Sequence, residues 1–354
     1  MIEIDGAYGE GGGQVLRSSL TLSALTGMPV IIRNIRANRS KPGLRPQHLA
    51  AVNAIAKITQ AQVEGNELNS SIVQLAPNKV AASDYSFDIP TAGALSLVLQ
   101  TIFLPLSFAA GKSRVTLTGG THVPWSPIWH YLQACWLPLM TSLGFRGDIQ
   151  LENAGFYPRG GGRVRVVILP VESLKPLVCL DRDDLLRIEG WSGVANLDLS
   201  IAKRQKHQAL SCLYEVCRNT KIKTVQIHSI GKGTFILLKA VFSSGSCACY
   251  SALGAPGKRA EEVADEAVDQ LLSFLGTDGC IDHYMADQIL LPLTVIPGKS
   301  AFTTSILSQH LLTNVHIIQK FLPVKINVTG RLNTPGTVEV EGLNLYNQEK
   351  TFIL

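Results

Sequence analysis

The stretch Arg45-Pro46-Gln47-His48-Leu49 has two counterparts in the same chain, Ile128-Trp129-His130-Tyr131-Leu132 and Ser308-Gln309-His310-Leu311. In each of them a histidine opens an apolar run of helical period. The histidines of the first two copies are 82 residues apart, whereas those of the last two are 180 apart. Equal repeats therefore leave 98 residues unexplained before the third copy. The simplest account is a unit present three times, with a second domain inserted into its last copy.

The hydrophobic periodicity of each unit predicts the order helix, strand, helix, strand, strand. In the first unit these elements are expected at 14–25, 30–35, 47–58, 61–63 and 71–75. In the second they are expected at 92–108, 114–117, 127–143, 148–151 and 164–169. In the third they are expected at 286–294, 301–306, 309–321, 324–328 and 337–341.

The pattern changes between residues 185 and 276. Here the sequence predicts a strand at 186–189, a basic helix at 199–217, strands near 225, 236 and 249, and a helix at 258–275. We therefore expect the fold class α/β. Residues 1–184 and 277–354 would form a large domain of three repeated units with pseudo-threefold symmetry, and residues 185–276 a smaller inserted α/β domain.

Composition narrows the class of protein only moderately. The 354 residues carry a formal net charge of +5, which is compatible with a nucleotide or nucleic-acid ligand but does not require one. Seven cysteines without a C-x-x-C pair suggest reduced thiols in the cytosol. The first residues lack the features of a signal peptide. The apolar stretch 92–110 contains Gln100 and Pro105, so we expect it to pack inside a cytoplasmic protein rather than to span a membrane.

A glycine-rich turn precedes the first helix, in the stretch Gly9-Glu10-Gly11-Gly12-Gly13-Gln14. Glycines before a helix let backbone N–H groups approach an anion, and the helix dipole favours negative charge there. Glu10 would repel a bare phosphate, so it suits a divalent cation that bridges to phosphate oxygens. The alternative is a sharp strand-to-helix turn with a solvated glutamate.

A basic loop follows the first expected strand. Four cations lie within ten residues, and they are Arg36, Arg39, Lys41 and Arg45. Guanidinium groups suit bidentate contacts with phosphate, and the loop directly precedes the helix start at Gln47 and His48. The loop is therefore a candidate phosphate or RNA site, although a solvated basic surface has the same composition.

Polar residues recur at equivalent points of the three units. The first helix of each unit carries a glutamine, namely Gln14, Gln100 and Gln288. A neutral imidazole at a helix start, such as that of His310, could attack an electrophilic phosphorus. The residues alone do not separate His310 from His48 and His130, although packing is the expected role of His130. Two Walker-like Gly-Lys-Ser sequences lack the earlier glycine, and no Lys-x-Asp-Gly sequence is present.

Five blocks of this chain resemble RNA 3′-terminal phosphate cyclases. They are residues 5–17 (Asp-Gly-Ala-Tyr-Gly-Glu-Gly-Gly-Gly-Gln-Val-Leu-Arg), 36–49, 156–162, 286–288 and 309–314. The resemblance runs the full length and implies three repeated units with an inserted smaller domain. It also implies an enzyme of the ligase class that converts an RNA 3′-phosphate to a 2′,3′-cyclic phosphate at the expense of ATP. The expected intermediates are a histidine–AMP phosphoramidate and an RNA–adenylate with a pyrophosphate linkage, and pyrophosphate and AMP are released.

The resemblance also assigns roles to individual residues. His310 is the expected nucleophile, and Glu10 the ligand for Mg²⁺ or Mn²⁺. The ATP site would comprise Arg17, Gln47, His48, Gln100, Pro127 and the segment Tyr284, Met285, Ala286, Asp287 and Gln288, with Tyr284 stacking on adenine opposite Pro127. Arg36 and Arg39, with Arg45 of the same loop, would contact the phosphate or the RNA end.

Two other classes stay open. A cyclase-like ribosome-assembly protein of the same superfamily lacks the nucleophile, whereas Glu10, Asp287 and His310 are all present here. An enolpyruvyl transferase has similar helix–sheet units but needs six of them, and this chain offers three. The expected partners are ATP and RNA with a 3′-phosphate end, and a homodimer is an arrangement that the sequence leaves open.

Overall fold

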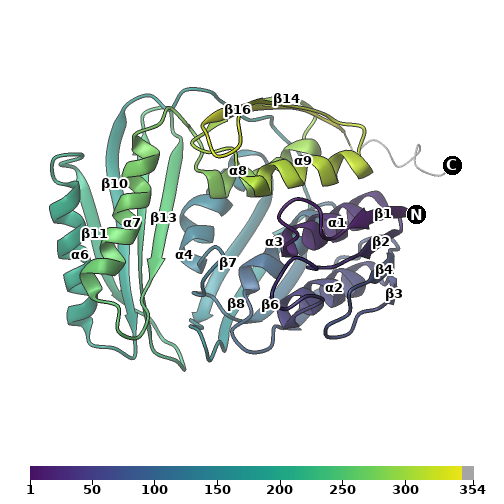
Figure 1. Ribbon diagram of the computed structural model, residues 1–354, viewed down its shortest axis with the longest axis horizontal. Coiled ribbons are helices and arrows are strands. Elements are labelled where there is room, and N and C mark those ends of the chain that lie inside the picture. The colour runs from purple at the N-terminus through teal and green to yellow at the C-terminus, as the bar shows by residue number, and fades with distance from the viewer. Residues whose placement is uncertain (345–354) are drawn as a thin grey trace.

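The structure is a computed structural model, and it describes residues 1–344. It is an α/β fold in which the strands form four-stranded sheets (Figure 1). In the first sheet, β1 (Ile2–Asp5) pairs parallel with β2 (Val30–Arg33). Strand β4 (Val73–Ala76) pairs antiparallel with β2 and with β3 (Gln62–Glu64), which gives the order β1-β2-β4-β3.

The same strand order and directions recur in two more sheets. The second has the order β5-β6-β8-β7, built from Asp84–Asp88, Ser113–Gly119, Gly162–Leu169 and Arg146–Asn153. The third has the order β9-β14-β16-β15, built from Val178–Cys179, Gly298–Thr304, Gly336–Gly342 and Lys325–Gly330. In both, the first two strands are parallel and the others antiparallel, as in the first sheet.

Two helical segments accompany each of these sheets. They are α1 (Gly13–Thr26) and α2 (Pro46–Thr59), then α3 (Leu95–Ser107) and a composite second helix, then α8 (His283–Thr294) and α9 (Gln309–Phe321). The composite helix consists of α4 (Trp129–Tyr131), a π-helical turn η1 (Leu132–Trp136) and α5 (Leu137–Ser142). Helix α1 packs against α2, α3 and α9, so the helices meet in the interior (Figure 1).

A fourth sheet lies at the left of Figure 1. Its order is β11-β10-β12-β13, built from Thr220–Gln226, Leu185–Ala195, Gly233–Phe242 and Cys247–Leu253. Helices α6 (Leu199–Leu213) and α7 (Ala260–Leu275) pack on it around a second apolar core. These elements lie within 185–276, the range for which the sequence predicts an inserted domain. Phe235 and Leu237 on the opposite face join the main core.

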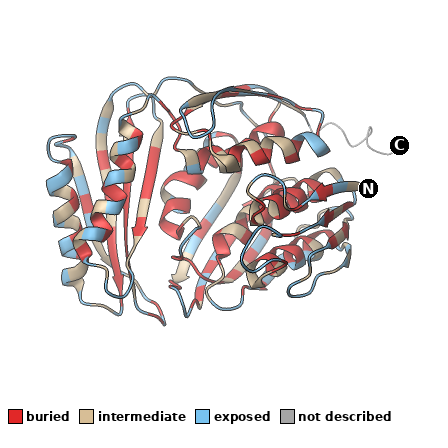
Figure 2. Cartoon of the chain, viewed as in Figure 1, coloured by how far each residue is buried: buried red, intermediate tan, exposed pale blue. Residues whose placement is uncertain are grey.

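The main core explains why the chain forms these helices. Figure 2 shows the interior faces of the central helices in red, and α1 buries Val15, Leu16 and Leu20 almost completely. Removing such side chains from water stabilises the fold by about 1.5–3 kcal/mol each. The apolar stretch expected to pack inside is helix α3, and nearly all of its side chains are buried. Within residues 1–344 no helix is long and apolar enough to cross a membrane.

The sequence interpretation misses the first strand of each repeated unit. Strands β1, β5 and β9 are short, and β1 and β5 alternate buried and exposed side chains over four or five residues. Strand β9 has only two residues and pairs with β14 across more than a hundred residues of chain. The alternation in β1 and β5 is a local signal that could have identified them, whereas β9 is defined only by its partner in the sheet.

The prediction that all cysteines are reduced thiols is wrong for one pair. Cys135 of the π-helical turn and Cys249 of β13 form a disulfide across 114 residues of chain. The two residues meet because the fourth sheet packs against the composite helix, where Lys239 Nζ also donates a hydrogen bond of 2.8 Å to the carbonyl of Ala134. Spacing along the sequence carries no information about this contact.

One buried carboxylate holds three segments together. Asp282, the residue before α8, is fully buried and accepts hydrogen bonds from the Met285 N–H (2.8 Å), the Cys249 N–H (3.3 Å) and the Tyr131 hydroxyl (3.1 Å). Burial raises the pKa of Asp282 to about 6, and the hydrogen bonds oppose that rise. Asp282 therefore connects the start of α8 to β13 and to α4.

We predict that Asp282→Ala lowers the free energy of unfolding by about 3 kcal/mol or more, because three buried donors lose their acceptor. Asp198 provides a matched control, since it also precedes a helix and accepts a bond from the Ser200 N–H (2.8 Å) but is exposed. Asp198→Ala should cost much less, because water can replace the contacts of an exposed cap. Denaturant unfolding above the pKa of Asp282 measures both values, and equal losses would contradict the role of Asp282 as a junction.

Candidate active site

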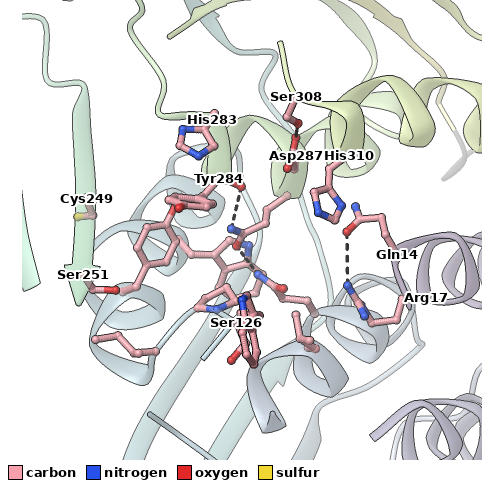
Figure 3. A pocket seen from close by; sticks show the side chains of 18 of the residues that line it. Gln14, Arg17, Ser126, Cys249, Ser251, His283, Tyr284, Asp287, Ser308 and His310 are labelled. Atoms are coloured by element: carbon pink, nitrogen blue, oxygen red, sulfur yellow. Dashed lines mark hydrogen bonds between the residues drawn. The ribbon is translucent and has the colours of Figure 1, made fainter. Parts of the chain in front are cut away.

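A cavity of about 790 Å³ lies where the starts of α1, α8 and α9 approach the middle of α3 and the loop before α4 (Figure 3). Parts of the chain far apart in sequence form its walls, including β13 and α7 of the fourth sheet. Seven of the predicted site residues line it, and they are Arg17, Gln100, Pro127, Tyr284, Asp287, Gln288 and His310. The cavity therefore gathers residues from all three of the segments that the sequence predicts to be repeats.

His310 and Glu10 are in direct contact. The Nε2 atom of His310, in the first turn of α9, lies 2.8 Å from Oε2 of Glu10 in the glycine-rich turn before α1. The turn can approach α9 this closely because Gly9 has a φ of +63°, and a Cβ atom there would lie 2.3 Å from the Thr313 hydroxyl oxygen. Ser308 begins α9 by accepting a hydrogen bond of 3.0 Å from the Leu311 N–H.

The contact changes the pKa of both partners. The hydrogen bond from His310 to Glu10 raises the pKa of the imidazole above 6.5; partial burial opposes the rise, while the charge of Asp287 adds to it. Burial alone would raise the pKa of Glu10, but the hydrogen bonds and charges of His310 and Arg39 lower it below 4.5. The pair therefore favours an imidazolium–carboxylate form, and the imidazole must lose that proton before its Nε2 can act as a nucleophile.

Asp287 lies beside His310 in the cavity wall (Figure 3). Its carboxylate accepts a hydrogen bond of 2.5 Å from the Ser308 hydroxyl, which also caps α9. Burial raises the pKa of Asp287 to about 7, while the Ser308 hydrogen bond and the charge of His310 act in the opposite direction. Asp287 thus fixes the first turn of α9 and the position of the His310 backbone.

Arg17 brings an unpaired cation to the cavity. Within residues 1–344 its guanidinium makes a single hydrogen bond, 3.4 Å long, to Gln14 Oε1 and no salt bridge (Figure 3). Burial lowers its pKa to about 10, and the charge of Glu10 opposes that effect. A guanidinium still charged at neutral pH and held at the cavity wall is suited to bind an anion such as phosphate.

His48 and Gln47 connect three helix starts without lining the cavity. The Nδ1 atom of His48 accepts a hydrogen bond of 3.2 Å from the Arg45 N–H, and its ring lies against Gly13 at the start of α1. Burial lowers the pKa of His48 to about 3, with the charges of nearby arginines adding to the effect. Gln47 Oε1 accepts a bond of 3.3 Å from the Ala94 N–H before α3.

The basic loop does not line the cavity. Arg36 donates to the carbonyls of Lys41 (2.6 Å) and Gly43 (3.0 Å), and Arg45 donates to Asn69 Oδ1 (2.8 Å). These two side chains therefore stabilise the loop itself in this structure. Arg39 differs, because its Nη2 lies 2.9 Å from Oε1 of Glu10 and so borders the Glu10–His310 pair.

Two glutamines and Tyr284 form a connected wall. Gln100 donates from Nε2 to Gln288 Oε1, and Gln288 Nε2 donates 2.8 Å to the Tyr284 carbonyl. Met285 and Ala286 lie in the main core with 2% and 0% of their surface exposed and do not line the cavity. Helix α8 has only one face toward the cavity, so consecutive residues cannot all reach it.

The sequence interpretation misses several lining residues. Helix α7 of the fourth sheet contributes Gln270, whose Oε1 accepts a hydrogen bond of 3.2 Å from the Tyr284 hydroxyl. Asn314 donates 3.0 Å to the Asp287 carbonyl and accepts 2.6 Å from the Ser18 hydroxyl. Asn314 follows His310 by one helical turn, which is a signal that could have identified it. Nothing in the sequence around Gln270 indicates that this residue lines the cavity.

His130 is not a competing nucleophile. It is buried with His122, whose Nε2 lies 2.8 Å from His130 Nδ1, and it packs against the ring of Phe235. Burial lowers the pKa of His130 to about 3. The expected packing role of His130 is confirmed. Of His48, His130 and His310, only His310 lines the cavity, where His283 at the start of α8 is a second lining histidine.

Glu10 could hold a divalent cation only together with other ligands. Among residues 1–344 no group of three or more His, Cys, Asp and Glu side chains is arranged around a metal position. Mg²⁺ is often bound by one or two carboxylates together with substrate phosphates and water. The single carboxylate of Glu10, beside the cation-lined cavity, fits that mode of binding.

Comparison with known proteins agrees on one family. A family model described as RNA 3′-terminal phosphate cyclase matches residues 8–328. Proteins named RNA 3′-terminal phosphate cyclase from Ignicoccus hospitalis and Methanopyrus kandleri are 40% and 41% identical, covering 97% and 96% of this chain and 99% and 98% of theirs. One from Nostoc punctiforme is 39% identical and covers 93% of this chain and 96% of its own.

A solved structure, the enolpyruvyl transferase NikO from Streptomyces tendae, aligns with 97% of this chain and 48% of its own at 12% identity and a TM-score of 0.41. That similarity is too low to support an inference about function. The match to the family model and the identity to full-length relatives are much stronger. The chain therefore belongs to the RNA 3′-terminal phosphate cyclase family.

Proposed function

We propose that this protein is an ATP-dependent RNA 3′-terminal phosphate cyclase that works through a covalent histidine–AMP intermediate. The observation that carries the proposal is the position of His310. Its imidazole lines the cavity, contacts Glu10 at 2.8 Å and shares the cavity with the guanidinium of Arg17, which has no salt bridge among residues 1–344. A nucleophile, a carboxylate and an anion-binding cation thus stand together at converging helix starts.

In the first step, Nε2 of His310 attacks the α-phosphorus of ATP. The bond from that phosphorus to the β-phosphate oxygen breaks, and pyrophosphate leaves. The attacking nitrogen must be unprotonated, so the proton shared with Glu10 has to depart first. Arg17 would stabilise the negative charge that develops on the phosphate oxygens.

In the second step, an oxygen of the RNA 3′-phosphate attacks the same phosphorus, and His310 leaves as the neutral imidazole. The product is an RNA–adenylate linked by a phosphoanhydride. In the third step the neighbouring 2′-hydroxyl attacks the RNA 3′-phosphorus, loses its proton to solvent and expels AMP. This closure is intramolecular, where effective molarities on the order of 10⁵ M are reached, so positioning needs little further help from the protein.

Other side chains would bind and orient the substrates. The adenine would lie against Tyr284 and Pro127, with Gln100 and Gln288 at its edges. Arg39, which contacts Glu10, would meet the RNA phosphate, and Arg36 and Arg45 would do so only after releasing their loop contacts. Mg²⁺ or Mn²⁺ bound at Glu10 would neutralise charge on the triphosphate.

We also infer that the first three sheets are repeats related by pseudo-threefold symmetry. Their common strand order supports this interpretation. The second candidate function, a scaffold in ribosome assembly, is less well supported, because a scaffold has no need of an accessible histidine paired with a carboxylate. Formation of a protein–AMP adduct distinguishes the two functions.

We predict that His310→Asn abolishes labelling of the protein by ATP carrying a radioactive α-phosphate, because the amide cannot act as a nucleophile. The adduct of the unmodified protein should be acid-labile and alkali-stable, as expected for a phosphoramidate. His316→Ala, which removes a ring stacked on Tyr8 outside the cavity, should label normally. Full labelling of His310→Asn together with loss in His48→Ala would move the nucleophile to His48.

A second prediction concerns the pKa of His310. In the absence of nucleotide and divalent cations, Glu10→Gln should lower this pKa, because the neutral amide stabilises the imidazolium less than the carboxylate does. The neutral fraction of His310 grows as pH rises through its pKa, so adduct formation should increase over the same range. NMR titration of the imidazole resonances measures the pKa, with His316 as an internal control.

Adding Mg²⁺ extends this test. If Glu10 binds the cation, Mg²⁺ should lower the pKa of His310 in the unmodified protein and leave it unchanged in Glu10→Gln. An identical pKa in the two proteins before Mg²⁺ is added would contradict the ion pair. A Mg²⁺-induced shift that persists in Glu10→Gln would place the cation elsewhere.

A further inference from the structure

Cysteines gather where the fourth sheet meets the rest of the molecule. Most of the seven cysteines of the chain take part, and they are Cys135 of the π-helical turn, Cys179 of β9, Cys247 and Cys249 of β13, and Cys280 before α8. Within residues 1–344 no group of three or more His, Cys, Asp and Glu side chains could hold a metal ion. The chemistry open to closely spaced sulfur atoms without such a metal position is thiol–disulfide exchange.

Three of these sulfur atoms are in contact. Cys135 and Cys249 form the disulfide described above, and the Sγ atom of Cys247 lies 4.0 Å from that of Cys135. Cys247 and Cys249 are two residues apart in β13, so their side chains leave the same face of the strand. Two cysteines of one strand face therefore compete for a single partner on the composite helix.

This contact allows the disulfide to move without an oxidant or a reductant. The Cys247 thiolate attacks the Sγ atom of Cys135, so that a Cys135–Cys247 bond forms and the Cys135–Cys249 bond breaks. Cys249 leaves as a thiolate and takes up a proton in place of the one that Cys247 lost. The exchange thus conserves both electrons and protons.

The exchange moves the disulfide toward solvent. Cys135 and Cys249 are each 0% exposed, so an external thiol reaches their bond only through local opening of the structure. Cys247 is partly buried, and a bond from Cys135 to Cys247 is therefore easier to attack from outside. Cys247 thus provides a route by which the buried bond can be opened.

The exchange should be slow at neutral pH. Burial raises the pKa of the Cys247 thiol, the charge of Lys239 opposes that rise, and the carboxylates of Asp282 and Glu189 add to it. Burial, the neighbouring Cys280 thiol and the charge of Cys247 also raise the pKa of Cys179 to about 12. Only the thiolate attacks a disulfide, so the Cys135–Cys249 form is long-lived.

The disulfide bears on the cavity because it fastens β13 beside the cavity wall. Cys249 lines the cavity (Figure 3), and its N–H donates 3.3 Å to Asp282, which begins α8. Without the covalent bond, the fourth sheet is held to the composite helix by noncovalent contacts alone, such as the hydrogen bond from Lys239 to the Ala134 carbonyl. Opening the disulfide therefore loosens a wall of the cavity.

We propose that Cys135, Cys247 and Cys249 form a thiol–disulfide exchange site that fastens the fourth sheet to the composite helix beside the cavity. In the closed form Cys135 is bonded to Cys249. Exchange through Cys247 exposes the bond to an external dithiol, which leaves as its own disulfide and returns the cysteines of this chain to thiols. The inference does not depend on the proposed function, since neither ATP nor RNA takes part.

Disulfide mapping tests whether Cys247 can take over the bond. Each protein is purified in air without reductant, alkylated in denaturant at mildly acidic pH and analysed by peptide mass spectrometry. The unmodified chain and Cys247→Ala should contain the Cys135–Cys249 bond, and Cys249→Ala should contain a Cys135–Cys247 bond instead. Cys135→Ala should contain no disulfide at Cys247 or Cys249.

Reduction provides the second measurement. Dithiothreitol should open the bond of Cys247→Ala roughly tenfold more slowly than that of the unmodified chain, because direct attack on two buried sulfur atoms requires local opening. Cys212→Ala is the matched control, since it removes an exposed thiol of α6 and should be reduced at the unmodified rate. Reduction should lower the Tm of the unmodified chain by several degrees and leave the Tm of Cys135→Ala unchanged.

Four outcomes overturn the inference. Free thiols at both Cys135 and Cys249 of the unmodified chain would show that the pair does not bond. Absence of a Cys135–Cys247 bond in Cys249→Ala would exclude the exchange. Equal rates of reduction with and without Cys247 would exclude its role in opening the bond. An equal fall in Tm on reduction of Cys135→Ala would assign the stabilisation to other sulfur atoms. Each of these results leaves the labelling of His310 by ATP, and so the proposed function, untouched.

Discussion

The site depends on one contact, between a carboxylate near the start of the chain and an imidazole near its end. Glu10 and His310 belong to turns that precede or begin two packed helices, α1 and α9, so their separation is fixed by how those helices meet. The Ser18 hydroxyl bonds to Asn314 across the same interface at 2.6 Å. A shift of α9 relative to α1 would therefore separate His310 from Glu10 and from Arg17 together.

Burying titratable side chains around the cavity costs the folded protein free energy. Burial lowers the pKa of Arg17 to about 10 and of His48 to about 3, and it raises the pKa of Asp287 to about 7. Each shift means that the charged form is less stable here than in water. The buried groups are tolerated because hydrogen bonds compensate some of them, as Ser308 does for Asp287. Arg17 has little compensation, which is understandable if an anion completes its surroundings.

The sequence allows much of the fold to be predicted and less of the site. The helix expected at 309–321 has the bounds of α9, because its apolar residues keep a strict helical period. Strand β9 could not be found, since two exposed or half-exposed residues become a strand only by pairing with β14. Similarly, the resemblance identifies Tyr284 and Gln288 but also names Met285 and Ala286, which the helical geometry of α8 turns into the core. The sequence interpretation does not include the lining residues Gln270 and Trp125, because nothing in their local sequence distinguishes them from surface residues.

The place where the extra sheet interrupts the chain explains its contribution to the cavity. The chain leaves the third sheet after β9 and returns at Asp282, immediately before α8. Because α8 carries Tyr284 in its first turn, the segment that returns must end beside the cavity. Asp282 then fixes β13 through the Cys249 N–H, and α7 reaches Tyr284 through Gln270. The fourth sheet therefore reaches the wall of the cavity because the chain passes from α7 directly to Asp282 and α8.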